Sequence, residues 1–332
     1  MNEQEKKIID EIRKNLTGDN EKDKTFLIKE AEKYKDNSEN SNIVKEIGKM
    51  LYEILPKEKM EEFSNAFKKD VDNINVKIDE AYKLMFTQER NMEKAKEILL
   101  EVINTPIEFK ENEQERFFSF GNIIEFLTSK YVLNLNKKAV WITLNYSLAY
   151  NLLAFISNEE HNYEKAIEYA DKALYYNPMD LNNAFEKGET YKMQRKYEDM
   201  LKVTTSIYEY IFSPEHLARY YRNLGYFYTE ACKFDVSFSL YLVSMLYQES
   251  KGAYQEIMYI KQVLKNPEYN IDLDTAFSIL EKNNIPIGIR KENVNILYSL
   301  YLDEQLRKHN PNVIQEIKRR LYKFTNDKQF LN

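Results

Sequence analysis

The chain has 332 residues and a formal net charge of -6, and its length allows either two domains or one extended repeat array. Hydrophobic residues make up 43% of it, which excludes a wholly disordered protein, and charged residues make up 31%, which predicts a well-solvated surface. Positive and negative residues are interspersed, without the basic patch that binds phosphate backbones. We therefore expect no nucleic-acid partner.

Glycine and proline are scarce, with 7 of each in the chain. Average usage would give roughly 23 glycines and roughly 17 prolines at this length. Because β folds need many turns rich in these two residues, their scarcity favours helices joined by short connections. The predicted fold class is all-α.

Three features of the sequence bear on location. The longest apolar stretch, residues 236–247, is too short to span a bilayer, and residues 1–7 lack the apolar run of a signal peptide. The single cysteine, Cys232, has no partner for an internal disulfide and fits a reducing compartment. We expect a cytoplasmic protein without membrane insertion.

Residues 1–70 form the first predicted segment. Apolar residues recur there at helical spacing, with breaks at residues 17–19 and 36–41, which predicts about three helices. The segment has no basic recognition helix of the kind that reads DNA. We interpret it as an N-terminal helical cap on a repeat array, and a separate interaction module is the alternative.

Residues 71–109 predict a degenerate first repeat, closed by Pro106. From residue 76 onward, six residues stand at the relative positions that recur in the units that follow: Tyr82, Phe86, Met92, Ala95, Leu99 and Val102.

Residues 110–146 are an aromatic-rich insertion that includes Phe117, Phe118, Phe120 and Trp141. We expect one helix near residues 122–132 and an extended stretch. Such a density of apolar side chains is not left in water. The insertion either packs against the first repeats or supplies an aromatic lining for a groove.

Residues 147–250 predict three helix–turn–helix units, at 147–180, 181–214 and 218–250. Pro106, Pro178 and Pro214 are separated by 72 and 36 residues, and Gly188 and Gly225 by 37. Periods near 34 residues are typical of helical solenoids. In each unit a small residue is expected where the two helices cross, namely Gly188 or Gly225 in the first helix and Ala166, Ala173 or Ser237 in the second. An aromatic residue precedes each second helix as a hydrophobic cap: Tyr163, Tyr197 and Phe234.

The first and third units resemble tetratricopeptide repeats, in the sequences NYEKAIEYADKALYYNP (162–178) and YYRNLGYFYTEACKFDVSFSLYLVS (220–244). The second unit departs from the motif at Lys187, Met200 and Ile207. In layout the chain is similar to uncharacterised bacterial tetratricopeptide proteins with a helical N-terminal segment. The resemblance implies an α-solenoid of stacked antiparallel helix pairs that forms a right-handed superhelix.

Residues 251–325 keep a helical period but lose the small residues at the crossings. Helices are predicted near residues 254–264, 273–282, 291–309 and 313–324. We interpret them as a divergent pair followed by a capping pair, because repeat arrays need polar ends. Residues 326–332 are a tail.

The sequence lacks the motifs of nucleotide cradles, zinc proteases, serine hydrolases and paired-cysteine sites. His161, His216 and His309 are far apart, and the first two are assigned to solvated turns, as is Cys232. We therefore predict no enzyme activity, no metal and no cofactor.

The candidate partner-binding site is a stripe on the first helix of each unit. The residues of this helix that do not pack in the core line the concave surface in tetratricopeptide proteins. The candidates are Asn151, Phe155, Phe185, Glu189, Lys192, Arg219, Arg222 and Tyr226; further members of the stripe are Leu148, Asn158, Asn182 and Thr229. Arg219 and Arg222 are expected to hold an acidic group, and Phe185 and Tyr226 to provide apolar anchors. The alternative is that these are only exposed helix residues.

A chaperone-tail receptor is not expected. Asn151 and Phe155 stand where the clamp of such receptors has a lysine and an asparagine, and Glu186 stands in place of a second asparagine. The predicted function is a scaffold or adaptor that holds a protein or peptide. An intracellular sensor of a short signalling peptide and an accessory subunit of an enzyme are the alternatives.

Overall fold

The computed structural model describes residues 3–34, 43–44, 46–47, 50–51, 73–87, 90–105 and 112–331. It forms two compact units, residues 1–73 and 74–332. The described residues are helical except for one small sheet and the connections, and adjacent helices pack in pairs, as in an α-solenoid. The expected boundary near residue 70, the break at 36–41 and Pro106 lie outside the described residues. No described helix has the length and apolar character that crossing a membrane requires.

The N-terminal unit contains helices α1 (Glu3–Lys14) and α2 (Asn20–Tyr34). The turn between them is held by the buried carboxylate of Asp23, which accepts hydrogen bonds from the N–H and hydroxyl of Thr17 and from the N–H of Gly18. Burying the apolar stripes of these helices forms a small core of its own: Ile9, Ile12, Leu27, Ile43, Ile47 and Met50.

The second unit begins with a helix at residues 73–86, followed by α5 (Met92–Ile103). The register of this first helix differs from the prediction. Its buried residues are Ile74, Ile78, Ala81 and Met85, whereas Tyr82 and Phe86 are 48% and 53% exposed. Helix α5 starts six positions after this helix ends, against four inside each of the three pairs between residues 146 and 247, so the two helices do not keep the spacing of those pairs. In α5 the expected Ala95, Leu99 and Val102 are buried.

The insertion packs into the core of this unit. Strands β1 (Glu115–Phe118) and β2 (Lys138–Trp141) pair in parallel, and α6 (Ile123–Val132) lies between them in sequence, capped by Asn122. Phe118 and Phe120 are buried, and the indole N–H of Trp141 donates to the carbonyl of Phe120 at 2.9 Å. Phe118 and Phe120 thus join the core, whereas Trp141 remains 38% exposed, and α6 also lines a pocket described below.

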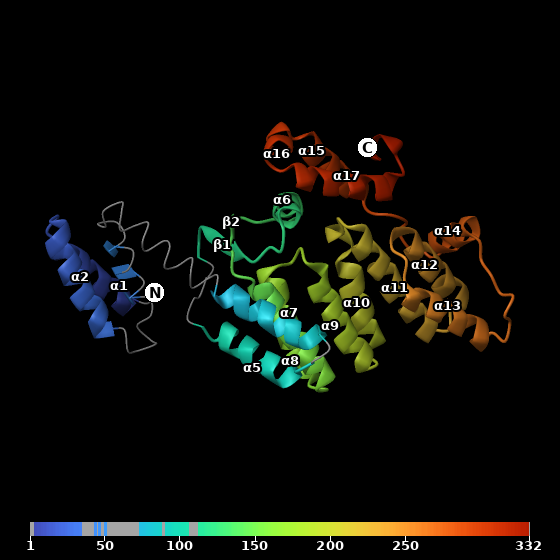
Figure 1. The fold of residues 1–332 in the computed structure, drawn as a ribbon, viewed down its shortest axis with the longest axis horizontal. Coiled ribbons are helices and arrows are strands. Elements are labelled where there is room, and N and C mark those ends of the chain that lie inside the picture. The colour runs from blue at the N-terminus through green and yellow to red at the C-terminus, as the bar shows by residue number, and fades with distance from the viewer. Residues whose placement is uncertain are drawn as a thin grey trace. The chain divides into compact units, whose positions relative to one another are not determined.

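Three helix pairs follow, α7 with α8, α9 with α10 and α11 with α12 (Figure 1). Their bounds are Tyr146–Glu159 and Tyr163–Tyr176, Leu181–Met193 and Tyr197–Ser206, and Pro214–Glu230 and Phe234–Tyr247. Helix α11 begins at Pro214 and is capped by Ser213, whereas the third unit was predicted to begin at Ala218. Proline is tolerated at the first helical position because the N–H it lacks has no partner within the helix there.

The turns inside the three pairs share one backbone conformation. The middle residues His161, Arg195 and Cys232 have φ angles of 58°, 57° and 55°, in the left-handed region. In each pair the next residue's N–H closes the turn onto the first helix, as from Lys233 to Tyr228 at 2.9 Å. This is the helix termination that glycine usually provides, achieved here without glycine.

The two helix-crossing glycines differ in the space around them. A Cβ on Gly225 would lie 3.0–3.2 Å from the ring of buried Tyr241 in α12. A Cβ on Gly188 would meet its nearest atoms, on Asn223 and Met200, at 3.9 Å. The crossing is therefore tight in the third unit and looser in the second.

Helices α13 (Lys251–Val263) and α14 (Leu273–Lys282) continue the array, but the helices after them do not cap its end as expected. Helices α15 (Lys291–Leu302), α16 (Glu304–His309) and α17 (Pro311–Thr325) return over α6 and the start of α11 (Figure 1). The side-chain N–H of buried Asn293 donates to the carbonyls of Glu209 and Ile211, both at 2.9 Å, next to the short helix η2 (Tyr208–Tyr210). This return places α17 beside the predicted binding helices.

Candidate functional site

Side chains of α9 and α11 form one continuous face, which we call the α9/α11 face. Its members are Asn182, Phe185, Glu189 and Lys192 of α9, with His216, Arg219, Arg222 and Tyr226 of α11. Direct contacts join the two helices: the Arg219 guanidinium lies 4.7 Å from the ring centroid of Phe185, and the Lys192 ammonium 4.1 Å from that of Tyr226. Six of the predicted site residues thus lie on this face, and five of them, all except Phe185, line one pocket.

These five residues line a pocket of about 220 Å³, the arginine pocket. Its wall is completed by α12 and the start of α13, with Tyr241, Ser250, Gly252, Ala253 and Glu256. Lys192 and Glu189 form an ion pair at 3.4 Å. The cations Arg219, Arg222 and Lys192 outnumber the carboxylates of Glu189 and Glu256 along this lining.

Arg222 lacks a counter-ion among the described residues. One of its terminal nitrogens donates to the side-chain oxygen of Gln248 at 3.2 Å, and the other, Nη1, is buried with no hydrogen-bond partner in the described part of the chain. Burial, and then the like charge of Arg219, lower the pKa of Arg222. A buried guanidinium in this state is stabilised by an anion that supplies the missing acceptor.

The remaining predicted residues do not reach this pocket. Asn151 and Phe155 lie on α7, where Phe155 packs against Phe86 with ring centroids 5.6 Å apart. Phe185 is only 1% exposed, so it is not the apolar anchor that was expected. Instead, its ring face packs against the guanidinium of Arg219, and the ring contacts that of His216 edge-on.

Two members of the wider stripe are buried as well. Asn158 donates to the carboxylate of Glu186 at 2.8 Å, and burial raises the pKa of Glu186 although this hydrogen bond opposes the shift. The hydroxyl of Thr229 donates to the carbonyl of Gly225 and pairs with Ser237. Both predicted groove residues instead serve to hold neighbouring helices together.

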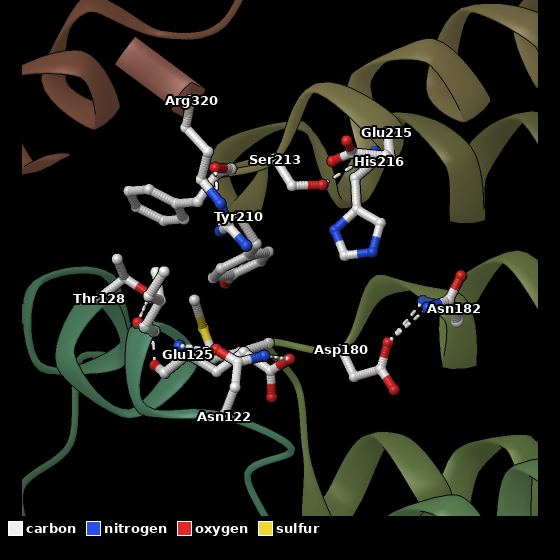
Figure 2. Close-up of a pocket in the computed structure, with 13 residues that line it drawn as sticks. Asn122, Glu125, Thr128, Asp180, Asn182, Tyr210, Ser213, Glu215, His216 and Arg320 are labelled. Carbon is white, nitrogen blue, oxygen red and sulfur yellow. Dashed lines mark hydrogen bonds between the residues drawn. The ribbon is translucent and has the colours of Figure 1, made fainter. Parts of the chain in front are cut away.

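A second pocket, the polar pocket, opens at the other end of the α9/α11 face and has a volume of about 310 Å³ (Figure 2). Four parts of the chain supply its polar side chains: Asn122, Glu125 and Thr128 of α6; Asp180 and Asn182 at the start of α9; Tyr210, Ser213, Glu215 and His216 around the start of α11; and Arg320 of α17. The pocket exists because α17 returns over α6 and α11.

His216 lies in this pocket, not in a solvated turn as predicted. It occupies the first turn of α11, where its backbone N–H donates to the capping hydroxyl of Ser213 at 3.1 Å. Its ring is half-buried and points into the pocket (Figure 2), without a hydrogen bond to any residue that the structure describes. Burial lowers the pKa of His216, while the charge of Asp180 opposes the shift and that of Arg320 adds to it.

The carboxylates of the polar pocket fall into two groups. Glu215 of the lining pairs with Arg319 at 2.9 Å, and Arg320 of the lining pairs at 2.7 Å with Glu316, which is outside the lining, so each of these charges has an opposite neighbour. Asp180 and Glu125 accept hydrogen bonds from neutral donors instead. Burial, and then the charge of Asp180, raise the pKa of Glu125. The charge of Arg320 opposes this shift but forms no salt bridge with Glu125, so the pocket holds two carboxylates without a salt bridge among the described residues.

Sequence reasoning missed this pocket because its residues come from segments as distant as Asn122 and Arg320. Two signals were present in the sequence: Asn122 and Asp180 are typical N-cap residues, and Pro214 marks a helix start. These signals locate helix ends but not their convergence.

Groups of three or more potential metal ligands do not occur in the described ranges. Comparison of the chain with protein-family models and with curated proteins gave no match.

Proposed function

We propose that this chain is a non-enzymatic adaptor of the tetratricopeptide-repeat type that binds a protein or peptide through the α9/α11 face. The repeat assignment is supported by the three helix pairs whose turns share a left-handed middle residue, at His161, Arg195 and Cys232. Helical repeats of this kind bind partners on surfaces built by successive helices.

The observation that carries the binding proposal is the state of Arg222. Its buried Nη1 lacks a hydrogen bond among the described residues, and its charged neighbour Arg219 has the same sign. An acidic side chain or terminal carboxylate of a partner would supply both an acceptor and a counter-charge. Tyr226, half-buried beside Lys192, would add an aromatic contact at the same pocket.

The experiment is affinity capture from an extract of the source cells, with proteins quantified by mass spectrometry. Three baits are compared: the wild-type chain, Arg222→Gln, and Lys202→Gln as a control on the exposed side of α10. We expect at least one protein to be retained by the wild type and the control but not by Arg222→Gln. Equal retention by all three baits would contradict the proposal.

A further inference from the structure

The polar pocket is positioned to act together with the arginine pocket. His216 lines the first pocket and Arg222 the second, and both belong to α11, six residues apart. Arg219 of the arginine pocket links the two: its guanidinium donates at 3.4 Å to the side-chain oxygen of Asn182, which lines the polar pocket, and lies over the ring of Phe185. A single partner segment lying along α11 would cross both pockets.

The two pockets favour ligands of opposite charge. In the arginine pocket the unpaired group is the Arg222 guanidinium. In the polar pocket Asp180 and Glu125 form no salt bridge with a described residue, since Arg319 and Arg320 pair with Glu215 and Glu316. One oxygen of Asp180 accepts both hydrogen bonds from Asn182, which leaves the other without a hydrogen bond among the described residues.

We infer that the polar pocket is a subsite for a cationic group, a primary ammonium or a guanidinium, carried by the same partner whose acidic group enters the arginine pocket. This inference rests on the proposed function. The Asp180 carboxylate is the counter-ion, and the imidazole of His216, which points into the pocket without a hydrogen bond to a described residue, accepts a second N–H (Figure 2). Burial lowers the pKa of His216, which favours this neutral, accepting form. A volume of about 310 Å³ accommodates a lysine or arginine side chain.

The spacing of the subsites predicts the spacing of the charges. His216 and Arg222 are six residues apart, which corresponds to about 9 Å along a helix axis at ~1.5 Å per residue. An extended peptide advances ~3.3 Å per residue. The two side chains also leave the helix about 120° apart at ~100° per residue, so the basic and acidic residues of the partner should stand at least about three positions apart.

The test uses a display library of random dodecapeptides selected on the full chain. We expect selected peptides to carry Lys or Arg at least three positions from Asp or Glu. For one such peptide, affinities are measured in two double-mutant cycles, which isolate a pairwise interaction. The first pairs Asp180→Asn with alanine at the peptide's basic residue; asparagine keeps the helix cap, since it caps as well as aspartate. The second pairs Arg222→Gln with alanine at the peptide's acidic residue.

We expect each single change to weaken binding about tenfold and the paired changes to cost little more than one of them. Additive effects in the first cycle, or selected peptides without a basic residue, would overturn this inference. The proposed function would still stand in that case, provided that the second cycle shows coupling. Additive effects in the second cycle would contradict the proposed function itself. A library that yields no binding peptide would contradict both.

Discussion

The hydroxyl of Tyr221 on α11 accepts a hydrogen bond of 2.7 Å from the backbone N–H of Gly288 in the connection between α14 and α15. The same hydroxyl donates to the carbonyl of Pro286 at 3.0 Å, and the hydroxyl of Tyr208 donates to the carbonyl of Gly288 at 3.0 Å. These bonds hold the connection at the point where the chain turns back toward α6 and α11. The return that builds the polar pocket therefore depends on them.

Replacing Tyr221 with phenylalanine should lower the free energy of unfolding by about 1–3 kcal/mol, because it leaves two backbone groups without their partner. Tyr254→Phe, at a tyrosine that is 59% exposed, serves as the control and should change stability little. Urea unfolding of both variants measures the difference. Equal stabilities would show that the Tyr221 hydrogen bonds do not hold the return.

The two crossing glycines predict opposite effects of the same substitution. Gly225→Ala should destabilise the protein by about 1–3 kcal/mol, because the new Cβ would press on the Tyr241 ring. Gly188→Ala should be neutral or stabilising by up to ~1 kcal/mol, because it has room for a Cβ and alanine favours the helix. Thermal melts of the two variants decide, and a similar loss in both would contradict the described crossings.

The left-handed turn residues predict a stabilising substitution. Cys232→Gly should raise the free energy of unfolding by about 0.5–1 kcal/mol. The left-handed conformation costs a residue with a side chain roughly 1–2 kcal/mol, and glycine avoids this cost but loses part of the gain because its unfolded chain is more flexible. The neighbouring Ala231 is also exposed but has a φ of -79°, so Ala231→Gly should be destabilising. If denaturant unfolding ranks the two variants in the reverse order, the turn conformation is wrong.

Glu316 predicts how stability depends on pH. Burial alone would raise its pKa, but hydrogen bonds from Arg319 and Arg320 outweigh burial and lower the pKa to about 2. A carboxyl group with a lowered folded-state pKa stabilises the fold above its unfolded pKa of 4.5, and this contribution is lost as the pH falls from there toward 2. The wild type should therefore exceed Glu316→Gln in stability at pH 6, and the gap should close by about pH 2.

Free energies of unfolding measured between pH 6 and pH 2 test this. Glu281→Gln, at an exposed glutamate of α14, controls for the substitution itself. A gap for Glu316→Gln that stays constant over the whole range would mean that the ion pairs with Arg319 and Arg320 do not form in solution.

Helical period and turn spacing were sufficient to predict the helix pairs of residues 147–250, because each pair is a local structure closed by a short turn. The same reasoning gave the wrong register for the helix at 73–86, where the connection to α5 is longer and Phe86 is exposed. The same reasoning also placed α15 and α17 at the end of the array. It could not predict their return toward α6 and α11, because the hydrogen bonds of Tyr221 and Asn293 that hold this return join residues more than 60 positions apart. Long-range pairings of this kind leave no period in a sequence.

The candidate site likewise contains residues whose position could be predicted from the sequence and residues whose position could not. Glu189 and Lys192 of α9 and Arg219, Arg222 and Tyr226 of α11 were predicted to lie on equivalent stripes of the two helices, so their meeting followed from spacing alone. The burial of Phe185 did not, because it depends on Arg219 and His216 covering the ring. Glu125 and Arg320 reach the polar pocket from α6 and α17, and neither element belongs to the repeat pattern.

The central claim is that an acidic group of the partner binds at Arg222. Replacing Arg219 together with Arg222 by alanine should weaken binding at least tenfold, about 1.4 kcal/mol. Arg219 also covers the ring of Phe185, however, so Arg222→Gln is the sharper change because it leaves this packing intact.

The decisive measurement is a calorimetric titration of the captured partner against the wild type, Arg222→Gln and Lys202→Gln, with circular dichroism to check that each variant is folded. The account predicts a Kd at least tenfold weaker for Arg222→Gln and unchanged for Lys202→Gln. An unchanged Kd for a folded Arg222→Gln variant would contradict it and would place the partner on another surface of the chain.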